Sequence, residues 1–219
     1  MRTIVIIPAR GGSKRLLKKN LKLLGGIPLI AHSILYAQAN QENIDAIFVS
    51  TDDAKIKKIA LKYGAEVIDR PKEISGDFEP TVSAIKHVIE TDIEYTENII
   101  TLQPTTPFRP KSLFKNAFEI YKNGNYDSLF TVSRNHKKLG HIKNNEFIPF
   151  NYEIGQRSQD IEKLFYENGL LYISKRELIL ENTIISKTAY PLLVENNATY
   201  LDIDTQEDFN YAEYLINKA

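Results

Sequence analysis

The sequence predicts an α/β protein in which helices cover an open, mostly parallel sheet. Short runs of β-branched residues, typical of strands buried on both faces, alternate with helical segments through about the first 130 residues. Parallel strands need helical crossovers, so this alternation indicates successive βαβ units. The chain has 219 residues, of which 42% are hydrophobic, and this suits one domain of that class. Residues 1–219 are therefore expected to form a single domain.

The elements of the first half follow in regular order. Thr3–Ile7 is the first expected strand, and the basic loop Pro8–Gly26 follows it. The helix Pro28–Asn40 begins with proline, whose fixed backbone angle suits a first turn. The helix Ala54–Tyr63 is preceded by Ser, Thr and Asp residues that can cap it, and Gly64 ends it. The further strands and helices are expected at Ala46–Val49 (strand), Ala65–Ile68 (strand), Thr81–Thr91 (helix), Asn98–Leu102 (strand), Ser112–Asn123 (helix) and Ser128–Val132 (strand).

The regular alternation breaks at residues 134–167. This segment is polar, with clusters of Lys and Asn and short aromatic patches, which favours an inserted arm carrying a hairpin over a second domain. A strand is expected to resume at Leu170–Ile173. Thr205–Lys218 is the last helix, and its first residues resemble a capping box.

Composition and charge narrow the classes of function. Lys and Arg number 28 and Asp and Glu number 28, so the net charge is zero, which argues against a general nucleic-acid binder. The chain has no cysteine, which excludes thiolate nucleophiles and Cys-ligated metals. Its first apolar run, Ile4–Ile7, is too short for a signal peptide or a membrane span. A cytoplasmic protein with neither nucleic-acid nor membrane partners is expected.

The loop after the first strand is the first candidate site. Arg10–Lys22 contains six basic residues and no acid. Gly11 and Gly12 lack a Cβ atom, so their backbone N–H groups can approach a phosphate closely. Ligands of open α/β sheets bind beyond the carboxyl ends of strands, and this loop leaves such an end. Neither the Walker A nor the dinucleotide glycine spacing is present, and a solvated basic loop remains an alternative.

Two further segments carry side chains suited to a ligand. If Asp202-Ile203-Asp204 is extended, both carboxylates share a face and can hold Mg²⁺ together with substrate phosphates. Alternatively, Asp204 or Thr205 caps the last helix, which leaves Asp202 as the better metal candidate. The stiff loop Leu102–Arg109 follows a strand, and its Gln103 offers a donor and acceptors to a sugar or base. A plain rigid turn is the alternative there.

Taken together and in this order, the motifs resemble the acylneuraminate cytidylyltransferase family, or CMP-sialic acid synthetases, with relatives that act on legionaminic and other nonulosonic acids. The matching segments span nearly the whole chain, and as an ordered set they are highly specific. They are Ile7-Pro8-Ala9-Arg10-Gly11-Gly12-Ser13-Lys14 with Lys19-Asn20, Val49-Ser50-Thr51-Asp52, Arg70-Pro71, Leu102-Gln103-Pro104-Thr105-Thr106-Pro107-Phe108-Arg109, Glu167-Asn168-Gly169 and Asp202-Ile203-Asp204-Thr205.

The resemblance implies a Rossmann-like sheet of the nucleotide-diphospho-sugar transferase type and a Mg²⁺-dependent reaction. CTP and a 2-keto-3-deoxy sugar acid would give a CMP-sugar and pyrophosphate. Arg10 and Lys19 would hold the triphosphate, and Asp202 and Asp204 the metal. The other implied contacts are Gly11, Gly12, Ser13, Lys14, Asn20, Arg70 and Thr81 (near Ser83) for the nucleotide, and Gln103, Arg157, Tyr166 and Asn168 for the sugar acid. The arm 134–167 would join two subunits in a homodimer and close over the neighbour's sugar site.

The sequence departs from the family's pattern in two places. Tyr166 stands where many relatives carry an Arg suited to a sugar carboxylate, and a phenol cannot form that bidentate ion pair. Arg157, Lys137 or Lys138 would take over this contact, or the sugar differs. The segment 77–80, Asp-Phe-Glu-Pro, also differs from the small residues common there. These departures bear on the identity of the sugar acid.

Three other functions fit parts of the same sequence pattern. A cytidylyltransferase for a Kdo-type sugar acid is the nearest alternative, and the Gly-Gly-Ser-Lys loop and the Lys19-Asn20 pair favour the sialic type. A non-catalytic nucleotide-binding protein on the same fold is a second alternative. An RNA-binding module is disfavoured, since the basic residues are not interleaved with aromatic ones.

Overall fold

A seven-stranded sheet forms the centre of the protein in the computed structural model, which describes residues 2–92, 94–195 and 200–218. Its strand order is β11-β7-β10-β6-β1-β4-β5. The strands are β1 (Thr3–Pro8), β4 (Ala46–Thr51), β5 (Glu66–Asp69), β6 (Asn98–Thr101), β7 (Ser128–Asn135), β10 (Leu164–Lys175) and β11 (Tyr190–Leu193). All neighbouring pairs are parallel except those of β10, which runs antiparallel to β6 and β7. The predicted open, mostly parallel α/β fold is confirmed.

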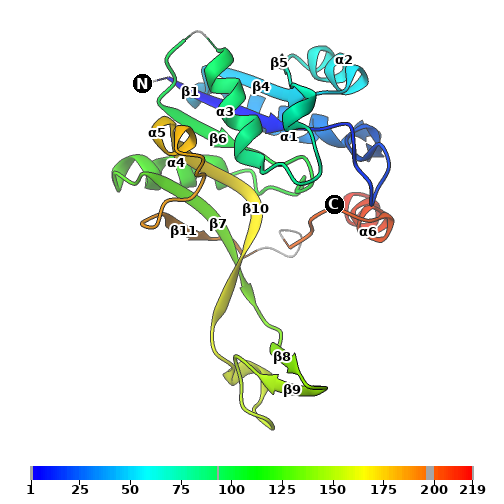
Figure 1. Ribbon diagram of the computed structural model, residues 1–219, viewed down its shortest axis with the longest axis vertical. Coiled ribbons are helices and arrows are strands. Elements are labelled where there is room, and N and C mark those ends of the chain that lie inside the picture. The colour runs from blue at the N-terminus through cyan, green and yellow to red at the C-terminus, as the bar shows by residue number, and fades with distance from the viewer. Residues whose placement is uncertain (1, 93, 196–199, 219) are drawn as a thin grey trace.

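Helices cover both faces of this sheet (Figure 1). Residues of α1, α2 and α4 pack in the core cluster on one face, and residues of α3 and α5 pack in the cluster on the other. The α-helices are α1 (Leu29–Gln38), α2 (Ala54–Lys62), α3 (Thr81–Thr91), α4 (Leu113–Asn123), α5 (Arg176–Leu180) and α6 (Gln206–Ile216). The short 3₁₀ helices are η1 (Lys19–Leu21), η2 (Gln41–Asn43), η3 (Lys72–Ile74) and η4 (Ser158–Asp160).

Strand β1 lies in the middle of the sheet, which explains its uninterrupted apolar sequence. Ile4 and Ile6 belong to one core cluster and Val5 and Ile7 to the other, and all four are fully buried. Successive side chains of a strand point to opposite faces, so both faces need apolar residues here. Burial of each such side chain contributes about 1.5–3 kcal/mol. The start of the chain is thereby fixed, and the basic loop leaves a rigid base.

A third cluster connects the basic loop with the last helix. Leu16, Leu24 and Leu29 pack against a group from the other end of the chain, namely Leu201, Ile203, Phe209 and Ala212. This packing brings two segments together that are far apart in sequence. Figure 1 accordingly shows α6 beside the loop that follows β1.

The capping box predicted for the last helix is present. The Thr205 hydroxyl accepts a hydrogen bond from the Asp208 N–H, and the Asp208 carboxylate accepts one from the Thr205 N–H. Burial opposes ionisation of Asp208, but bonds from the N–H groups of Thr205 and Asp204 outweigh it and hold the pKa of the carboxyl below its ordinary value of 3.8. The charged carboxylate therefore stabilises the start of α6.

The predicted arm projects from the sheet and carries a hairpin. Strands β7 and β10 run beyond the body as a paired ribbon, and β8 (Gly140–Lys143) and β9 (Glu146–Pro149) form the hairpin near its end (Figure 1). Asn144 and Asn145 join them with φ angles of 49° and 65°, as a tight primed turn requires. Both ribbon strands are longer than predicted, because their outer halves lie beyond the body and pair with each other there.

Some elements lie outside the predictions. Strand β11 pairs with β7 alone and contains Pro191, which an edge strand tolerates because one side needs no partner. Helix α5 and the small hairpin of β2 (Leu23–Leu24) and β3 (Ile27–Pro28) are too short for a periodic signal. Throughout the described ranges, no helix is both long and apolar enough to cross a membrane.

Candidate functional site

Residues of four of the predicted motifs follow the carboxyl ends of four neighbouring parallel strands. Arg10 comes after β1, Asp52 after β4, Arg70 after β5 and Gln103 after β6. These ends meet at one edge of the sheet, which is where ligands of open α/β sheets bind. Two adjoining pockets lie there, and Pro8, Arg10, Asp77, Pro104 and Thr105 line both of them.

The first pocket, of about 390 Å³, is the cationic one. Its polar lining residues are Arg10, Ser13, Lys14, Arg15, Lys19, Asn20, Asp77, Thr105 and Asp204. Two hydrogen bonds fix the backbone of the basic loop. The Gly11 N–H donates to the Asp52 carboxylate over 2.9 Å, and the Asn20 amide donates to the Arg10 carbonyl over 3.0 Å. The loop thus keeps its cationic side chains around a defined space.

The two glycines of the loop have different surroundings. A Cβ atom on Gly11 would lie 2.8 Å from the Cβ atom of Asp53, closer than such atoms approach in proteins. Asp53 caps α2 by accepting bonds from Lys55 and Ile56, so it cannot easily yield. A Cβ atom on Gly12 meets nothing within 4 Å. Glycine at position 11 is therefore required by contact with α2, a reason that the sequence did not reveal.

The basic loop Pro8–Gly26 (the cationic loop) and the late acidic segment Asp202-Ile203-Asp204 converge, as the sequence predicted. The Lys19 ammonium lies 2.7 Å from one oxygen of Asp204, and the Arg15 guanidinium lies 2.6 Å from the other. Leu201 and Ile203 are buried, whereas the alternating acids face outward. The packing of these apolar residues in the third cluster is what brings the acids to the cations.

The two acids of this segment have different neighbours. Asp204 lines the cationic pocket, whereas the charge of Asp202 acts on Tyr172. Burial, followed by the charges of Glu167 and Asp202, raises the pKa of the Tyr172 hydroxyl, which donates to Glu167 over 3.4 Å. Among the described residues, no three His, Asp or Glu side chains form a metal-binding group. Mg²⁺ commonly takes one or two carboxylates together with substrate phosphates, so the donor set fits an ion that arrives with the nucleotide.

The second pocket, of about 250 Å³, contains three more of the predicted residues. Arg70, Thr81 and Gln103 line it. The Arg70 guanidinium donates to the hydroxyl and the carbonyl of Ser50, over 3.0 Å and 2.8 Å, and burial lowers its pKa. Ser83, by contrast, lines neither pocket. This half of the site is less cationic and has room for the rest of a nucleotide or for a sugar.

Gln103 is positioned by Arg109, to which the sequence assigned no role. The buried guanidinium donates to the carbonyls of Gln103 and Leu170, at 2.6 Å each, and to the hydroxyls of Ser33 and Thr106. Burial lowers the pKa of Arg109 to about 10. It makes no ion pair with a carboxylate among the described residues. Its place at the end of a stiff loop was the only signal in the sequence.

The predicted sugar contacts of the arm lie outside both pockets of the single chain. Arg157 is on the arm and pairs with Asp160 over 2.6 Å, and Tyr166 lies half-exposed on β10. Asn168 is buried, where the hydroxyl of Thr131 donates to its oxygen and its nitrogen donates to Ser133. Asn168 thus shapes the bulge in β10. The structure of the single chain therefore does not bring Arg157 to either pocket.

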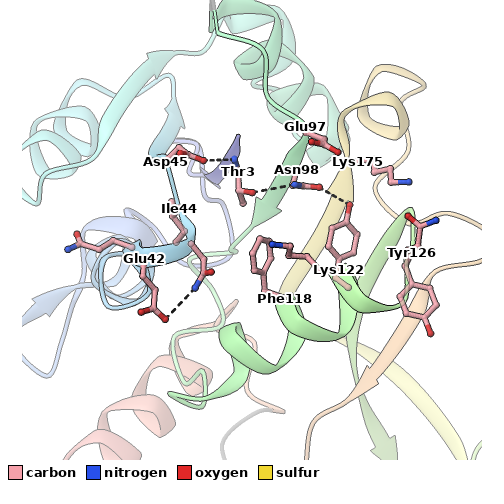
Figure 2. Close-up of a pocket in the computed structure, with 14 residues that line it drawn as sticks. Thr3, Glu42, Ile44, Asp45, Glu97, Asn98, Phe118, Lys122, Tyr126 and Lys175 are labelled. Atoms are coloured by element: carbon pink, nitrogen blue, oxygen red, sulfur yellow. Dashed lines mark hydrogen bonds between the residues drawn. The ribbon is translucent and has the colours of Figure 1, made fainter. Parts of the chain in front are cut away.

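A further pocket, of about 580 Å³, lies at the opposite edge of the sheet (Figure 2). At its centre Asn98 donates to the Thr3 hydroxyl and accepts from the Tyr121 hydroxyl, so these polar groups satisfy one another. None of the predicted site residues lines this pocket. It also lies at the amino ends of the parallel strands, away from the edge where ligands bind in this fold class.

Comparison with known proteins points to one family. The chain matches the sequence model of the cytidylyltransferase family over residues 4–219. It is 32% identical over 224 residues to the pseudaminic acid cytidylyltransferase of Campylobacter jejuni, covering 98% of this chain and 96% of that protein. It is 34% identical over 234 residues to the CMP-N,N'-diacetyllegionaminic acid synthase of Legionella pneumophila, covering 99% and 97%.

Another relative is about twice as long. The N-acylneuraminate cytidylyltransferase of Streptococcus agalactiae is 33% identical over 216 residues, and the match covers 95% of this chain but 52% of that protein. Among solved structures, the CMP:2-keto-3-deoxy-manno-octonic acid synthetase complexed with CTP superimposes with a TM-score of 0.71 at 15% identity, over 100% of this chain and 99% of that one. The structural likeness at this identity concerns the fold.

Proposed function

This chain belongs to the cytidylyltransferase family, and from that premise we propose that it transfers CMP from CTP to a 2-keto-3-deoxy sugar acid of the nonulosonic type and releases pyrophosphate. The convergence of the cationic loop with Asp204 is the observation that carries the proposal. The relatives named for nonulosonic acids are 32–34% identical to this chain over its whole length. The octonic acid synthetase shares 15%, so a nonulosonic acid is favoured over a Kdo-type one.

The cationic pocket is the proposed place of the triphosphate. Arg10, Lys14, Arg15 and Lys19 bring four positive charges to a space of about 390 Å³. Arg and Lys side chains form short, charge-assisted hydrogen bonds with phosphate oxygens. Because the loop is fixed by Asp52 and Asn20, little reorganisation is needed when the nucleotide binds. The adjoining pocket with Arg70, Thr81 and Gln103 is left for the nucleoside or for the sugar acid.

The reaction is an in-line substitution at phosphorus. The anomeric hydroxyl oxygen of the sugar acid bonds to the α-phosphorus, the bond to the β-phosphate bridge breaks with its electron pair on pyrophosphate, and the hydroxyl proton passes to water. Arg10 and Lys19 stabilise the charge that grows on the leaving pyrophosphate. Catalysis of this kind rests on positioning and charge neutralisation.

A divalent ion is part of the proposal. Asp202 and Asp204 are the residues that would hold Mg²⁺, which neutralises phosphate oxygens when bound. In the structure both oxygens of Asp204 contact cationic side chains, Lys19 and Arg15, so these side chains hold the carboxylate ready at the pocket. We place the reaction in the cytoplasm, whose reducing conditions suit a chain without cysteine.

The arm is proposed to join two copies of the chain. It exposes large apolar side chains, including Ile142 (77% exposed) and Phe150 (59% exposed), which water-facing strands rarely carry in such density. Sedimentation of Ile142→Asp should report a monomer where the unchanged chain is a dimer. Leu61→Asp, at an exposed apolar position on α2, is the matched control. A monomeric unchanged chain contradicts this part of the proposal.

The test of the activity is pyrophosphate release by the purified chain. CTP and Mg²⁺ are combined with separate sialic, legionaminic, pseudaminic and Kdo-type acids. We expect turnover with a nonulosonic acid and a fall of about 10²–10³ in rate for Arg10→Ala. Asp202→Ala should lower the rate and weaken the dependence on Mg²⁺. CTP binding without turnover for any acid would instead favour a non-catalytic nucleotide-binding protein.

A further inference from the structure

The carboxylate of Asp77 lies where the two pockets meet. It contacts two cations of the proposed triphosphate site, Arg10 at 2.8 Å and Lys14 through its other oxygen. Both pockets include Asp77 in their lining. The acid comes from neither the cationic loop nor the late acidic segment, but from the connection between η3 and α3.

The segment that carries Asp77, residues 75–80, is attached to the body mainly through these ion pairs. The side chain of Phe78 is fully exposed, so no apolar packing holds the segment down. Among the described residues, its backbone makes one hydrogen bond within the segment, from the Glu79 N–H to the Gly76 carbonyl at 3.4 Å. Its ends are tied only to the adjoining turns, where Ser75 donates to the carbonyls of Pro71 and Lys72 and the Pro80 carbonyl accepts from the Ser83 N–H. Few buried contacts and exposed hydrogen bonds are the features of a segment that moves at low cost.

Arg10 and Lys14 cannot serve Asp77 and a triphosphate with the same donors at the same time. Asp77 carries one negative charge, whereas a nucleoside triphosphate carries several and offers many more acceptor oxygens. The nucleotide therefore displaces Asp77 from the two cations, but breaking the two ion pairs makes the net free energy of nucleotide binding less favourable. The same competition acts in reverse when pyrophosphate is the remaining anion.

We propose that Asp77 is an internal counter-anion, a positioning residue that occupies Arg10 and Lys14 in the free protein, yields them to the triphosphate and takes them back as pyrophosphate leaves. The inference rests on the proposed function, whose triphosphate site it uses. It explains how a site with four cations on one loop can release a multiply charged product. It also assigns a purpose to an acid in a segment that differs from the family's small residues.

The test compares Asp77→Asn with Glu73→Gln. Glu73 is an exposed acid on η3, it makes no ion pair within the described ranges, and its replacement changes the net charge equally. Binding of inorganic pyrophosphate and of CTP is measured by calorimetry, and pyrophosphate inhibition by initial rates. Partly exposed ion pairs are weak, so we expect Asp77→Asn to bind pyrophosphate about 3- to 10-fold more tightly and to show a lower KM for CTP. Glu73→Gln should stay within about twofold of the unchanged chain.

The outcomes separate this inference from the proposed function. If the unchanged chain binds CTP and pyrophosphate but Asp77→Asn binds them no more tightly than Glu73→Gln does, the counter-anion role is wrong and the cytidylyltransferase activity is unaffected. Weaker binding by Asp77→Asn would also overturn it, because the carboxylate would then be assisting the nucleotide. If the unchanged chain binds neither anion, both proposals fail. Asp77→Ser, judged by the same criteria, replaces Asp77→Asn if circular dichroism shows that the first variant is unfolded.

Discussion

Replacing Arg109 with lysine should lower the free energy of unfolding by about 1–3 kcal/mol. The guanidinium donates to the carbonyls of Gln103 and Leu170 and to the hydroxyls of Ser33 and Thr106, all within 3.2 Å. A lysine keeps the charge but carries its donors on a single nitrogen, which cannot span these groups. The Leu170 carbonyl then loses this buried donor, which costs about 1–3 kcal/mol, whereas the Gln103 carbonyl keeps weaker bonds from Ser33 and Thr106.

The assay is urea denaturation followed by circular dichroism, since the chain has no tryptophan. Arg157→Lys is the matched control, because that guanidinium is exposed on the arm and its change should stay within about 0.5 kcal/mol. We also expect a lower kcat/KM for folded Arg109→Lys, since Gln103 loses its anchor. A loss of less than about 1 kcal/mol would refute the reasoning, because the spread of N–H donors on the guanidinium would then be unnecessary for stability.

Three further outcomes are expected. Lys19→Ala should reduce kcat by about 10²–10³ in the pyrophosphate assay, and near-normal turnover of a folded variant would exclude its role. Gly11→Ala should raise the KM for CTP, because its Cβ atom overlaps the start of α2, whereas Gly12→Ala, which meets open space, should not. The lowered pKa of Asp208 means that its cap stabilises the fold above pH 3.8 and is lost as the pH falls through the folded pKa, so Asp208→Asn should flatten the acid decline of the urea midpoint.

The elements that could be predicted from the sequence are those whose own residues, through capping or an apolar pattern, determine the helix or strand. Helix α3 was expected and found at Thr81–Thr91, and the capping residues before α2 and α6 act as predicted. Strand β1 was recognisable because both of its faces are buried. The outer halves of β7 and β10 could not be found in this way, since no core covers them and each depends on pairing with the other. Pro191 concealed β11, because only an edge position makes proline acceptable in a strand.

The site was predictable as far as its residues stand next to strand ends or in recognisable motifs. Arg10, Lys19 and Asp204 line one pocket because the basic loop leaves the end of β1 and the alternating residues 201–204 pack their apolar side chains against it, and both features are recognisable in the sequence. The contacts of Asp77 and Arg109 depend on how two connecting segments fold back, for which no periodic pattern exists. The roles assigned to all of these residues, including those on the arm, stay predictions.

A ribosome makes the basic residues of the cationic pocket long before it makes Asp204. Lys19 and Asp204 are 185 positions apart, and the third cluster that holds the acid in place is completed only after every strand of the described sheet has been translated. At about 5–20 residues per second, this interval lasts roughly 10–40 seconds. On the proposed mechanism, a nascent chain can build its sheet during that time but cannot transfer CMP, because it lacks the two carboxylates that would hold the metal ion.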